Sequence, residues 1–306
     1  MVMEEAREIL VIGGSRYFGK RLITRLLAAG DRVTVLNRGS SAPPPGVTHL
    51  VADRNDERSL TEALGSRTFD VVVDQVCYTP RQAEIARRVF TGRTRRYVMT
   101  STVEVYEYED SITPVREDAV DPLTVPVDLE LPWEDPEFLD SHYGEGKRQA
   151  EAVFAAAPDF PYVAVRVAHV LGGADDFTGR LDHYASRIRA REPIAVPFSN
   201  QPATYIHVEE IADFLVWAAG ADFTGPVNAA SHGPLTTVDL CEAIVAHIPE
   251  GKVVLQLVEV GEVSPFSFFR SYGMDNSRAT KLGFVFRAAP AWLSAAVAET
   301  LEKDDN

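Results

Sequence analysis

Short apolar runs alternate along the first half of the chain with segments whose apolar residues recur at helical spacing. The run Ile9–Ile12 is entirely apolar and Val33–Leu36 is rich in β-branched residues, which is typical of strands buried on both faces of a parallel sheet. The pattern predicts strands at residues 9–12, 33–36, 48–52, 70–74, 97–100 and 162–167, and helices at residues 20–29, 57–64, 81–90 and 143–157. Strands separated by helices at this spacing indicate an α/β fold built on a doubly wound parallel (Rossmann) sheet.

Two stretches interrupt this alternation. Residues 40–46 are rich in serine and proline and predict a stiff loop. Residues 110–141 contain five prolines and become strongly acidic in their later part. A loop of that length inside a compact domain is usually functional or mobile. We expect either a rim or lid beside a binding site or a plain solvated acidic loop.

A glycine-rich turn joins the first expected strand to the first expected helix. The turn consists of Gly13, Gly14, Ser15, Arg16, Tyr17, Phe18 and Gly19. Free backbone N–H groups and the helix dipole converge at such a turn, and glycines let the backbone approach a pyrophosphate closely. The order of strand, turn and helix therefore predicts a dinucleotide site, with a mere tight turn as the alternative.

The end of the second expected strand predicts which dinucleotide is bound. A carboxylate at this position holds the ribose 2′-hydroxyl of NAD, whereas a basic residue accommodates the 2′-phosphate of NADP. Here the strand ends in Asn37 and Arg38, without a carboxylate. Arg16 in the glycine turn is a second guanidinium for the same phosphate. We expect NADP(H), with NAD(H) as the alternative cofactor and a solvated loop arginine as the alternative role of Arg38.

A tyrosine and a lysine stand four residues apart where the last of these helices begins. Tyr143 and Lys147 share a helix face, so the ammonium can lie beside the phenol. A neighbouring cation favours the phenolate, which can then accept or donate a hydroxyl proton. Thr100–Thr102 ends a buried strand at the carboxyl edge of the sheet, where such sheets bind ligands. The pattern favours redox chemistry at an alcohol or a ketone.

With these motifs the chain resembles an extended short-chain dehydrogenase/reductase of the NAD(P)-dependent epimerase/dehydratase family. The resemblance spans nearly the whole chain. It comprises the turn 13–19, Asp53, the segment 100–106, Tyr143-x-x-x-Lys147, and the segments 166–172, 205–212 and 225–228.

The resemblance implies a role for each matching residue. Tyr143 would be the acid/base, and Lys147 its pKa modifier and a ligand of the nicotinamide ribose. Thr102 occupies the serine or threonine position of the family, and Asp53 would contact the adenine. The nicotinamide would be bordered by Thr100, Val167, Ala168 and His169.

Three departures from the family pattern bear on the substrate. Arg16 replaces the middle glycine of the turn, as in NADP-using relatives. Val103-Glu104 replaces the Asp-Glu pair of the 4,6-dehydratases, which removes the usual proton donor and leaves Glu104 as a candidate base. Ala203-Thr204 stands where many members carry an arginine that grips a diphosphate.

We therefore expect an NADP(H)-dependent enzyme acting on a secondary alcohol or ketone of a sugar or nucleotide sugar, with epimerisation by transient oxidation as one form of the reaction. The alternatives are net reduction of a ketone on a non-nucleotide metabolite, and a relative without catalysis that senses cofactor or binds RNA. The resemblance implies a dinucleotide-binding domain at residues 1–172, to which 205–230 return. Residues 173–306 would mainly form a smaller substrate-binding domain, and the chain would form a homodimer.

Charge and cysteine content limit the partners. The chain carries 30 basic and 45 acidic residues, a net charge of −15, which disfavours nucleic acid and anionic membranes. Cys77 and Cys241 form no CxxC motif, and the histidines lack metal-binding spacing, so we expect no metal. The first residues lack a signal-peptide pattern, which predicts a cytoplasmic protein whose partner is a small-molecule substrate.

Overall fold

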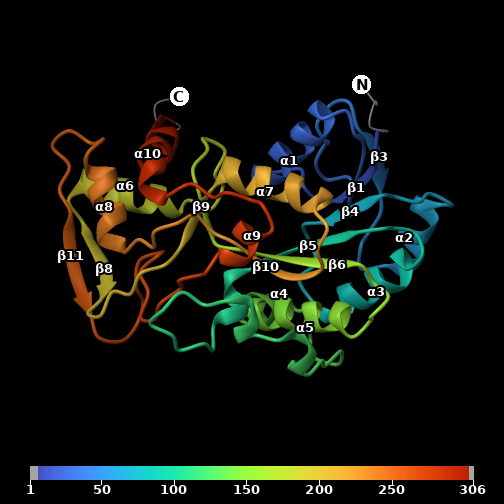
Figure 1. Ribbon diagram of the computed structural model, residues 1–306. Coiled ribbons are helices and arrows are strands. Elements are labelled where there is room, and N and C mark those ends of the chain that lie inside the picture. Colours follow the sequence, from blue (N-terminus) through green and yellow to red (C-terminus); the bar gives the residue numbers. More distant parts are fainter. Residues whose placement is uncertain (1–5, 303–306) are drawn as a thin grey trace. The chain divides into compact units, whose positions relative to one another are not determined.

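The computed structural model describes residues 6–302 and has an α/β architecture (Figure 1). The chain forms two compact units, each taken from several segments. Unit 1 consists of residues 1–107, 117–166 and 212–227, and unit 2 of residues 108–116, 167–211 and 228–306. Among the helices of residues 6–302, none combines the length and the apolar composition that crossing a membrane requires.

The central sheet of unit 1 has seven strands in the order β10-β6-β5-β4-β1-β2-β3. These strands are β1 (Glu8–Ile12), β2 (Arg32–Asn37), β3 (Thr48–Val51), β4 (Val71–Asp74), β5 (Tyr97–Thr102), β6 (Tyr162–Val167) and β10 (Gly225–Ala229). β1 pairs in parallel with β2 on one side, at Ile9↔Val33, and with β4 on the other, at Leu10↔Val72. The strand order therefore reverses beside β1, and this is the point where doubly wound sheets bind ligands at their carboxyl edge.

Helices cover both faces of this sheet, as Figure 1 shows for α1 (Tyr17–Ala28) and α7 (Val208–Gly220) on one side and α3 (Pro80–Phe90) and α5 (Tyr143–Ala155) on the other. An ion pair of 2.5 Å between Arg25 and Asp213 joins α1 to α7. The helix α2 (Glu57–Leu64) is capped by Asp56, whose side chain accepts from the amides of Arg58 and Ser59. The buried layer under α2, α3 and α5 includes Leu10, Leu36, Leu60, Leu64, Val72, Phe90, Tyr97 and Phe154.

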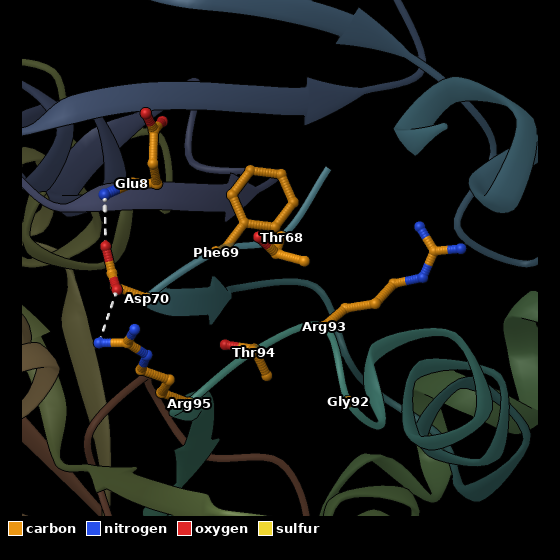
Figure 2. A pocket seen from close by; sticks show the side chains of 8 residues that line it. All are labelled: Glu8, Thr68, Phe69, Asp70, Gly92, Arg93, Thr94 and Arg95. Atoms are coloured by element: carbon orange, nitrogen blue, oxygen red, sulfur yellow. Dashed lines mark hydrogen bonds and ion pairs between the residues drawn. The ribbon is translucent and has the colours of Figure 1, made fainter. Parts of the chain in front are cut away.

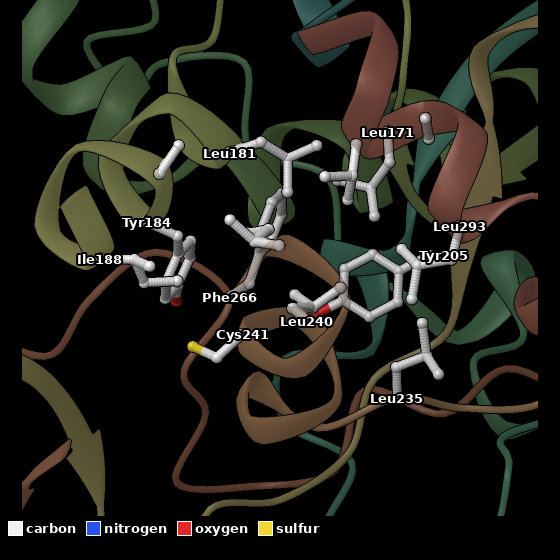
Figure 3. Packing of buried hydrophobic residues seen from close by; sticks show 14 of the residues in the cluster. Leu171, Leu181, Tyr184, Ile188, Tyr205, Leu235, Leu240, Cys241, Phe266 and Leu293 are labelled. Atoms are coloured by element: carbon white, nitrogen blue, oxygen red, sulfur yellow. The ribbon is translucent and has the colours of Figure 1, made fainter. Parts of the chain in front are cut away.

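Unit 2 contains two small parallel sheets and four helices. The sheets are β7 (His169–Leu171) with β9 (Tyr205–His207), and β8 (Pro193–Pro197) with β11 (Val254–Val258). The helices are α6 (Arg180–Ala190), α8 (Thr237–Val245), α9 (Ser277–Lys281) and α10 (Leu293–Glu302). Leu181, Tyr184 and Ile188 of α6 pack with residues of α8 and α10 in a buried cluster (Figure 3). Unit 2 thus has a hydrophobic core of its own.

The acidic segment 110–141 is more ordered than a plain solvated loop. It contains two 3-10 turns, at residues 117–119 and 122–124, and the short helix α4 (Pro136–Ser141). Trp133 is only 4% exposed, and its indole Nε1 donates a hydrogen bond of 2.8 Å to the Asp128 carbonyl. The proline count predicted an irregular path, but it gave no sign of the buried tryptophan that anchors it.

A buried ion pair lies at the carboxyl end of β4. Asp74 is 0% exposed and accepts hydrogen bonds from Arg54, from the Tyr97 hydroxyl at 2.6 Å and from the Val76 amide at 2.9 Å. Arg54 is itself only 7% exposed. Removing one partner of such a pair leaves the other charge buried without compensation, which is strongly unfavourable.

We expect Asp74→Ala to lower the free energy of unfolding by about 3 to 5 kcal/mol, because Arg54 would stay buried and uncompensated. The matched control is Glu62→Ala, which breaks the exposed Arg58–Glu62 pair of α2 and should cost less than about 1 kcal/mol. Urea unfolding followed by circular dichroism measures both. Equal losses in the two variants would contradict this account of the buried pair.

Candidate active site

The turn between β1 and α1 has a backbone that only glycine allows at low cost. Gly13 and Gly14 have φ of +82° and +74°. A Cβ at Gly19 would lie 2.5 Å from the Gly14 Cα, so a side chain there would force the turn away from the helix. No side chain caps the amino end of α1. The Gly19 amide donates to the Arg16 carbonyl at 3.0 Å, and the dipole of α1 favours an anionic group at this end of the helix.

Asn37 at the end of β2 has a structural role that the sequence did not predict. Its amide nitrogen donates to the Ser15 hydroxyl at 3.0 Å and to the Ser41 carbonyl at 3.1 Å. Its amide oxygen accepts from the Gly39 amide at 2.8 Å and lies 3.0 Å from the His49 ring nitrogen. Four partners satisfy the whole capacity of a side-chain amide. Asn37 therefore ties the glycine turn to the loop after β2 and has no donor to spare for a ribose hydroxyl.

Other residues expected around the dinucleotide differ in exposure. Arg16 and Arg38 are exposed, on the glycine turn and just after β2. Asp53 is exposed too, and its carboxylate accepts from the Asn55 amide at 2.9 Å. Tyr17, by contrast, is 5% exposed and has a φ of +51°, so its ring packs inside the protein. The expected contacts of these residues with a dinucleotide stay predictions.

Tyr143 and Lys147 both lie on α5, which packs very close to its neighbours. A Cβ at Gly144 would lie 2.5 Å from the Glu104 carbonyl oxygen, and one at Gly146 would overlap the Tyr78 carbonyl oxygen. The two glycines between the tyrosine and the lysine therefore let α5 approach the carboxyl edge of the sheet. In this position the Lys147 Nζ lies 5.7 Å from the centroid of the Tyr143 ring.

Lys147 is a buried cation. It is 1% exposed, and its Nζ donates a hydrogen bond of 2.7 Å to the Thr100 carbonyl. Burial lowers the pKa of Lys147 from 10.5 to about 8, against the opposing attraction of the Asp74 carboxylate. The ammonium is therefore charged at neutral pH and close to losing its proton, which suits a group that adjusts the ionisation of a neighbouring phenol.

The hydroxyl residues at the end of β5 have distinct surroundings. The Thr102 side chain accepts from the Glu104 amide at 3.2 Å and caps the 3-10 turn 103–106. The Thr100 hydroxyl is buried and finds no hydrogen-bond partner among residues 6–302. A buried hydroxyl without a partner is unfavourable in the protein alone, so Thr100 is suited to meet a ligand.

Val167 and His169 belong to unit 2, and their expected place beside the nicotinamide stays a prediction. His169 is buried and stacks on Phe268, with ring centroids 5.1 Å apart. Burial lowers the pKa of His169 to about 3, so its imidazole is neutral at physiological pH. In this state it can serve as a packing and hydrogen-bonding group but not as a cation.

The sequence assigned no role of their own to two side chains near this site, the buried Arg166 and the half-buried Tyr78. Arg166 is 0% exposed and donates to Glu151 at 2.7 Å and to the Tyr106 hydroxyl at 2.9 Å, which joins β6 to α5. Tyr78, four residues after β4, has its ring beneath the Lys147 ammonium. A signal existed only for Arg166, a charge inside the otherwise apolar run 163–167. No local pattern marks Tyr78.

A separate hollow of about 290 Å³ lies near the amino ends of β1 and β4 (Figure 2). Asp70 accepts from the Glu8 amide at 2.9 Å and forms an ion pair of 3.4 Å with Arg95. The polar groups in Figure 2 thus hold neighbouring strands together. None of the expected site residues lines this hollow.

The low pKa of Lys147 predicts a change of stability with pH. The folded chain releases this proton near pH 8 and the unfolded chain near 10.5, so between these values the unfolded chain binds more protons and stability rises with pH. Lys147→Met removes the buried charge, and its stability relative to the wild type should fall by about 2 to 3 kcal/mol between about pH 7 and 10. Urea unfolding at several pH values measures this. A constant difference between Lys147→Met and the wild type at every pH would contradict the prediction.

Comparison with known proteins places this site in a family. The NAD dependent epimerase/dehydratase family pattern matches residues 9–230. A chloroplast stem-loop binding protein of 41 kDa from Arabidopsis thaliana is 25% identical over 67% of this chain and 53% of its own length. UDP-glucuronic acid decarboxylase 4 from Arabidopsis thaliana is 24% identical over 80% of this chain and 58% of its own length. The chain thus spans little more than half the length of these curated relatives.

A solved structure extends the likeness to the whole fold. The crystal structure of the Bordetella bronchiseptica enzyme WbmG in complex with NAD and UDP matches with a TM-score of 0.73. The match covers 100% of this chain and 96% of the WbmG chain at 18% identity. The seven-stranded parallel sheet, the glycine turn after β1 and the family pattern across residues 9–230 agree with one another. This chain belongs to the NAD dependent epimerase/dehydratase family.

Proposed function

We propose that this protein is an NADP(H)-dependent oxidoreductase of the epimerase/dehydratase type, acting at a secondary alcohol or ketone of a sugar or nucleotide sugar. One observation carries the proposal: a buried ammonium, that of Lys147, lies 5.7 Å from the ring of Tyr143 at the carboxyl edge of the sheet. A desolvated cation lowers the pKa of a neighbouring phenol, which helps the phenol to exchange a proton with an alcohol.

The residues present fit a nicotinamide dinucleotide. The uncapped amino end of α1, the positive φ of Gly13 and Gly14, and the unpartnered Thr100 hydroxyl are features that such a ligand would satisfy. The glycine turn would hold the pyrophosphate, and Thr100 and Lys147 would face the nicotinamide ribose. When bound, the nicotinamide accepts or delivers the hydride.

The chain's own groups then handle the proton. The Tyr143 oxygen takes the proton of the substrate hydroxyl during oxidation and returns one to the carbonyl oxygen during reduction. The Lys147 charge lowers the cost of the phenolate that exists between these steps. The Thr102 hydroxyl, at the end of β5, would hold the reacting oxygen.

The selectivity for NADP would come from two exposed arginines. Arg16 and Arg38 stand on the glycine turn and after β2, where a 2′-phosphate is recognised. The Asn37 amide is fully used inside the protein, so it does not replace the carboxylate that holds the ribose of NAD. Guanidinium groups also supply local positive charge in a chain whose net charge is −15.

The proposal includes two possible net reactions, epimerisation and ketone reduction. Epimerisation would return the hydride to the same carbon and consume no cofactor, whereas a ketone reductase would consume one cofactor per turnover. Glu104 would act as a base in reactions that need a second proton transfer. Stem-loop binding, the property in the name of one relative, is disfavoured by the charge of −15, which repels a phosphate backbone.

We expect Tyr143→Phe to lower kcat by about 10² to 10⁴-fold, because the proton acceptor is lost while the helix is kept. The assay screens nucleotide sugars, beginning with UDP-glucuronic acid, and simple ketones, following nicotinamide absorbance and deuterium uptake from solvent. Tyr162→Phe, at a half-buried tyrosine where β6 begins, is the control and should retain activity. Unchanged turnover in Tyr143→Phe would refute the catalytic assignment.

We expect calorimetry to find tighter binding of NADPH than of NADH. Arg16→Ala and Arg38→Ala should each weaken NADPH binding by about tenfold, the value of one charge-assisted contact, and leave NADH binding unchanged. Lys20→Ala, at an exposed cation on α1, is the control and should alter neither. Tighter binding of NADH by the wild type would reject NADP as the cofactor.

A further inference from the structure

Tyr78 lies closer to the active-site lysine than Tyr143 does. The Lys147 Nζ is 4.5 Å from the centroid of the Tyr78 ring and 5.7 Å from that of Tyr143. The two rings are 6.2 Å apart and inclined by 47°. The buried ammonium is therefore in contact range of two aromatic faces as well as the Thr100 carbonyl that accepts its hydrogen bond.

The backbone around Tyr78 fixes the place of this ring. The Tyr78 amide donates to the Gln82 side-chain oxygen at 2.6 Å. Thr79 caps α3, with Pro80 in the first helical turn. On the other side the Tyr78 carbonyl occupies the space that a Cβ at Gly146 would need. Tyr78 is thus held between α3 and α5, and its position is linked to the helix that carries Tyr143 and Lys147.

The Tyr78 hydroxyl is not fixed by the residues that the structure describes. It makes no hydrogen bond with any residue in the range 6–302, although the side chain is half-buried. The ring is accordingly the part of Tyr78 that the protein uses. The face of an aromatic ring carries negative electrostatic potential, so it stabilises a cation that has been removed from water.

The charged and titratable groups around Lys147 come from several elements. Asp74 at the end of β4 and Glu151 on α5 favour its protonated form, whereas Arg54 after β3 opposes it. Cys77 lies in the loop after β4, and burial raises the pKa of its thiol to about 11, so at neutral pH it is uncharged. Arg54 and Asp74 pair with each other. Their effects on Lys147 are opposed, and the Glu151 carboxylate pairs with Arg166 at 2.7 Å. The groups in direct contact with the ammonium are therefore neutral: the Thr100 carbonyl and the two aromatic rings.

We propose that Tyr78 is a positioning residue of the active site, whose ring face holds the Lys147 ammonium charged and in place beside Tyr143. The ring acts through Lys147 and not by contact with the reacting atoms. The inference rests on the proposed function for its catalytic meaning. Its physical content, the effect of the ring on Lys147, does not need turnover to be tested.

The test is a pH titration of Lys147 by NMR in protein labelled with ¹³C at lysine Cε. The chain has five lysines, so the spectrum holds few signals, and the signal lost in Lys147→Met assigns the buried one. Tyr78→Leu removes the ring and should increase the acid dissociation constant of Lys147 by about tenfold. Tyr78→Phe keeps the ring without the hydroxyl and should titrate as the wild type does.

Two further variants separate the effect of the ring from a general loss of packing. Tyr162→Leu removes a half-buried tyrosine at the start of β6 and should leave the Lys147 titration unchanged. Pentafluorophenylalanine at position 78 keeps the ring's shape and reverses the sign of its face, so it should act like Tyr78→Leu even if the leucine variant folds poorly.

The inference is overturned by any of three results. These are an unchanged Lys147 titration in Tyr78→Leu, an unchanged titration with the fluorinated ring, and a shift in Tyr78→Phe as large as that in Tyr78→Leu, which would assign the effect to the hydroxyl. A normal titration shift without turnover on any alcohol would leave the ring's role standing and reject the proposed function instead. Turnover together with an unchanged titration in Tyr78→Leu would support the proposed function and reject the role of the Tyr78 ring.

Discussion

The desolvation of one ammonium group organises the candidate active site. Lys147 is almost completely buried, and water no longer solvates its charge. The Thr100 carbonyl and the faces of Tyr78 and Tyr143 surround it instead. A cation in such a place acts strongly on nearby ionisable groups, because the local dielectric is low. The same burial brings its pKa down to about 8, and the nearby carboxylates of Asp74 and Glu151 oppose this decrease.

The contacts of Lys147 depend on the close packing of α5. At Gly144 and Gly146 the carbonyl groups of Glu104 and Tyr78 lie so near the helix that a Cβ would not fit. A helix with larger residues at these positions would stand further from the sheet and would leave the lysine within reach of water. The sequence Tyr-Gly-Glu-Gly-Lys therefore does two things. It supplies a phenol and an ammonium, and its glycines let the helix bring both groups close to the sheet.

The sheet and its helices could be predicted because their signals are local. Buried parallel strands appear as apolar runs, and α2 was predicted with the bounds observed, Glu57–Leu64, since Asp56 and Gly65 stop it at both ends. The proximity of Tyr143 and Lys147 on one helix face could be predicted because a spacing of four residues on a helix is a local fact as well. Tyr78 and the Arg54–Asp74 pair could not, because each depends on elements that only the folded sheet brings together. Asn37 shows a third case, in which the sequence marked the position at the end of β2 but gave no sign that its amide serves the turn.

The saturation of the Asn37 amide has a consequence for cofactor choice. A residue at the end of β2 usually recognises the ribose directly, and a carboxylate there accepts a hydrogen bond from a free 2′-hydroxyl. In this chain that position is occupied by a side chain whose two donors and two acceptor sites already bind Ser15, Ser41, Gly39 and His49. Under the proposed function, discrimination at the ribose would depend on other groups, of which Arg16 and Arg38 are the proposed ones. Because both are exposed, their attraction for a phosphate is screened by salt, so selectivity built on them would weaken as ionic strength rises. A carboxylate-based preference for NAD would instead depend on a hydrogen bond and respond little to salt, so the salt dependence of the preference separates the two origins.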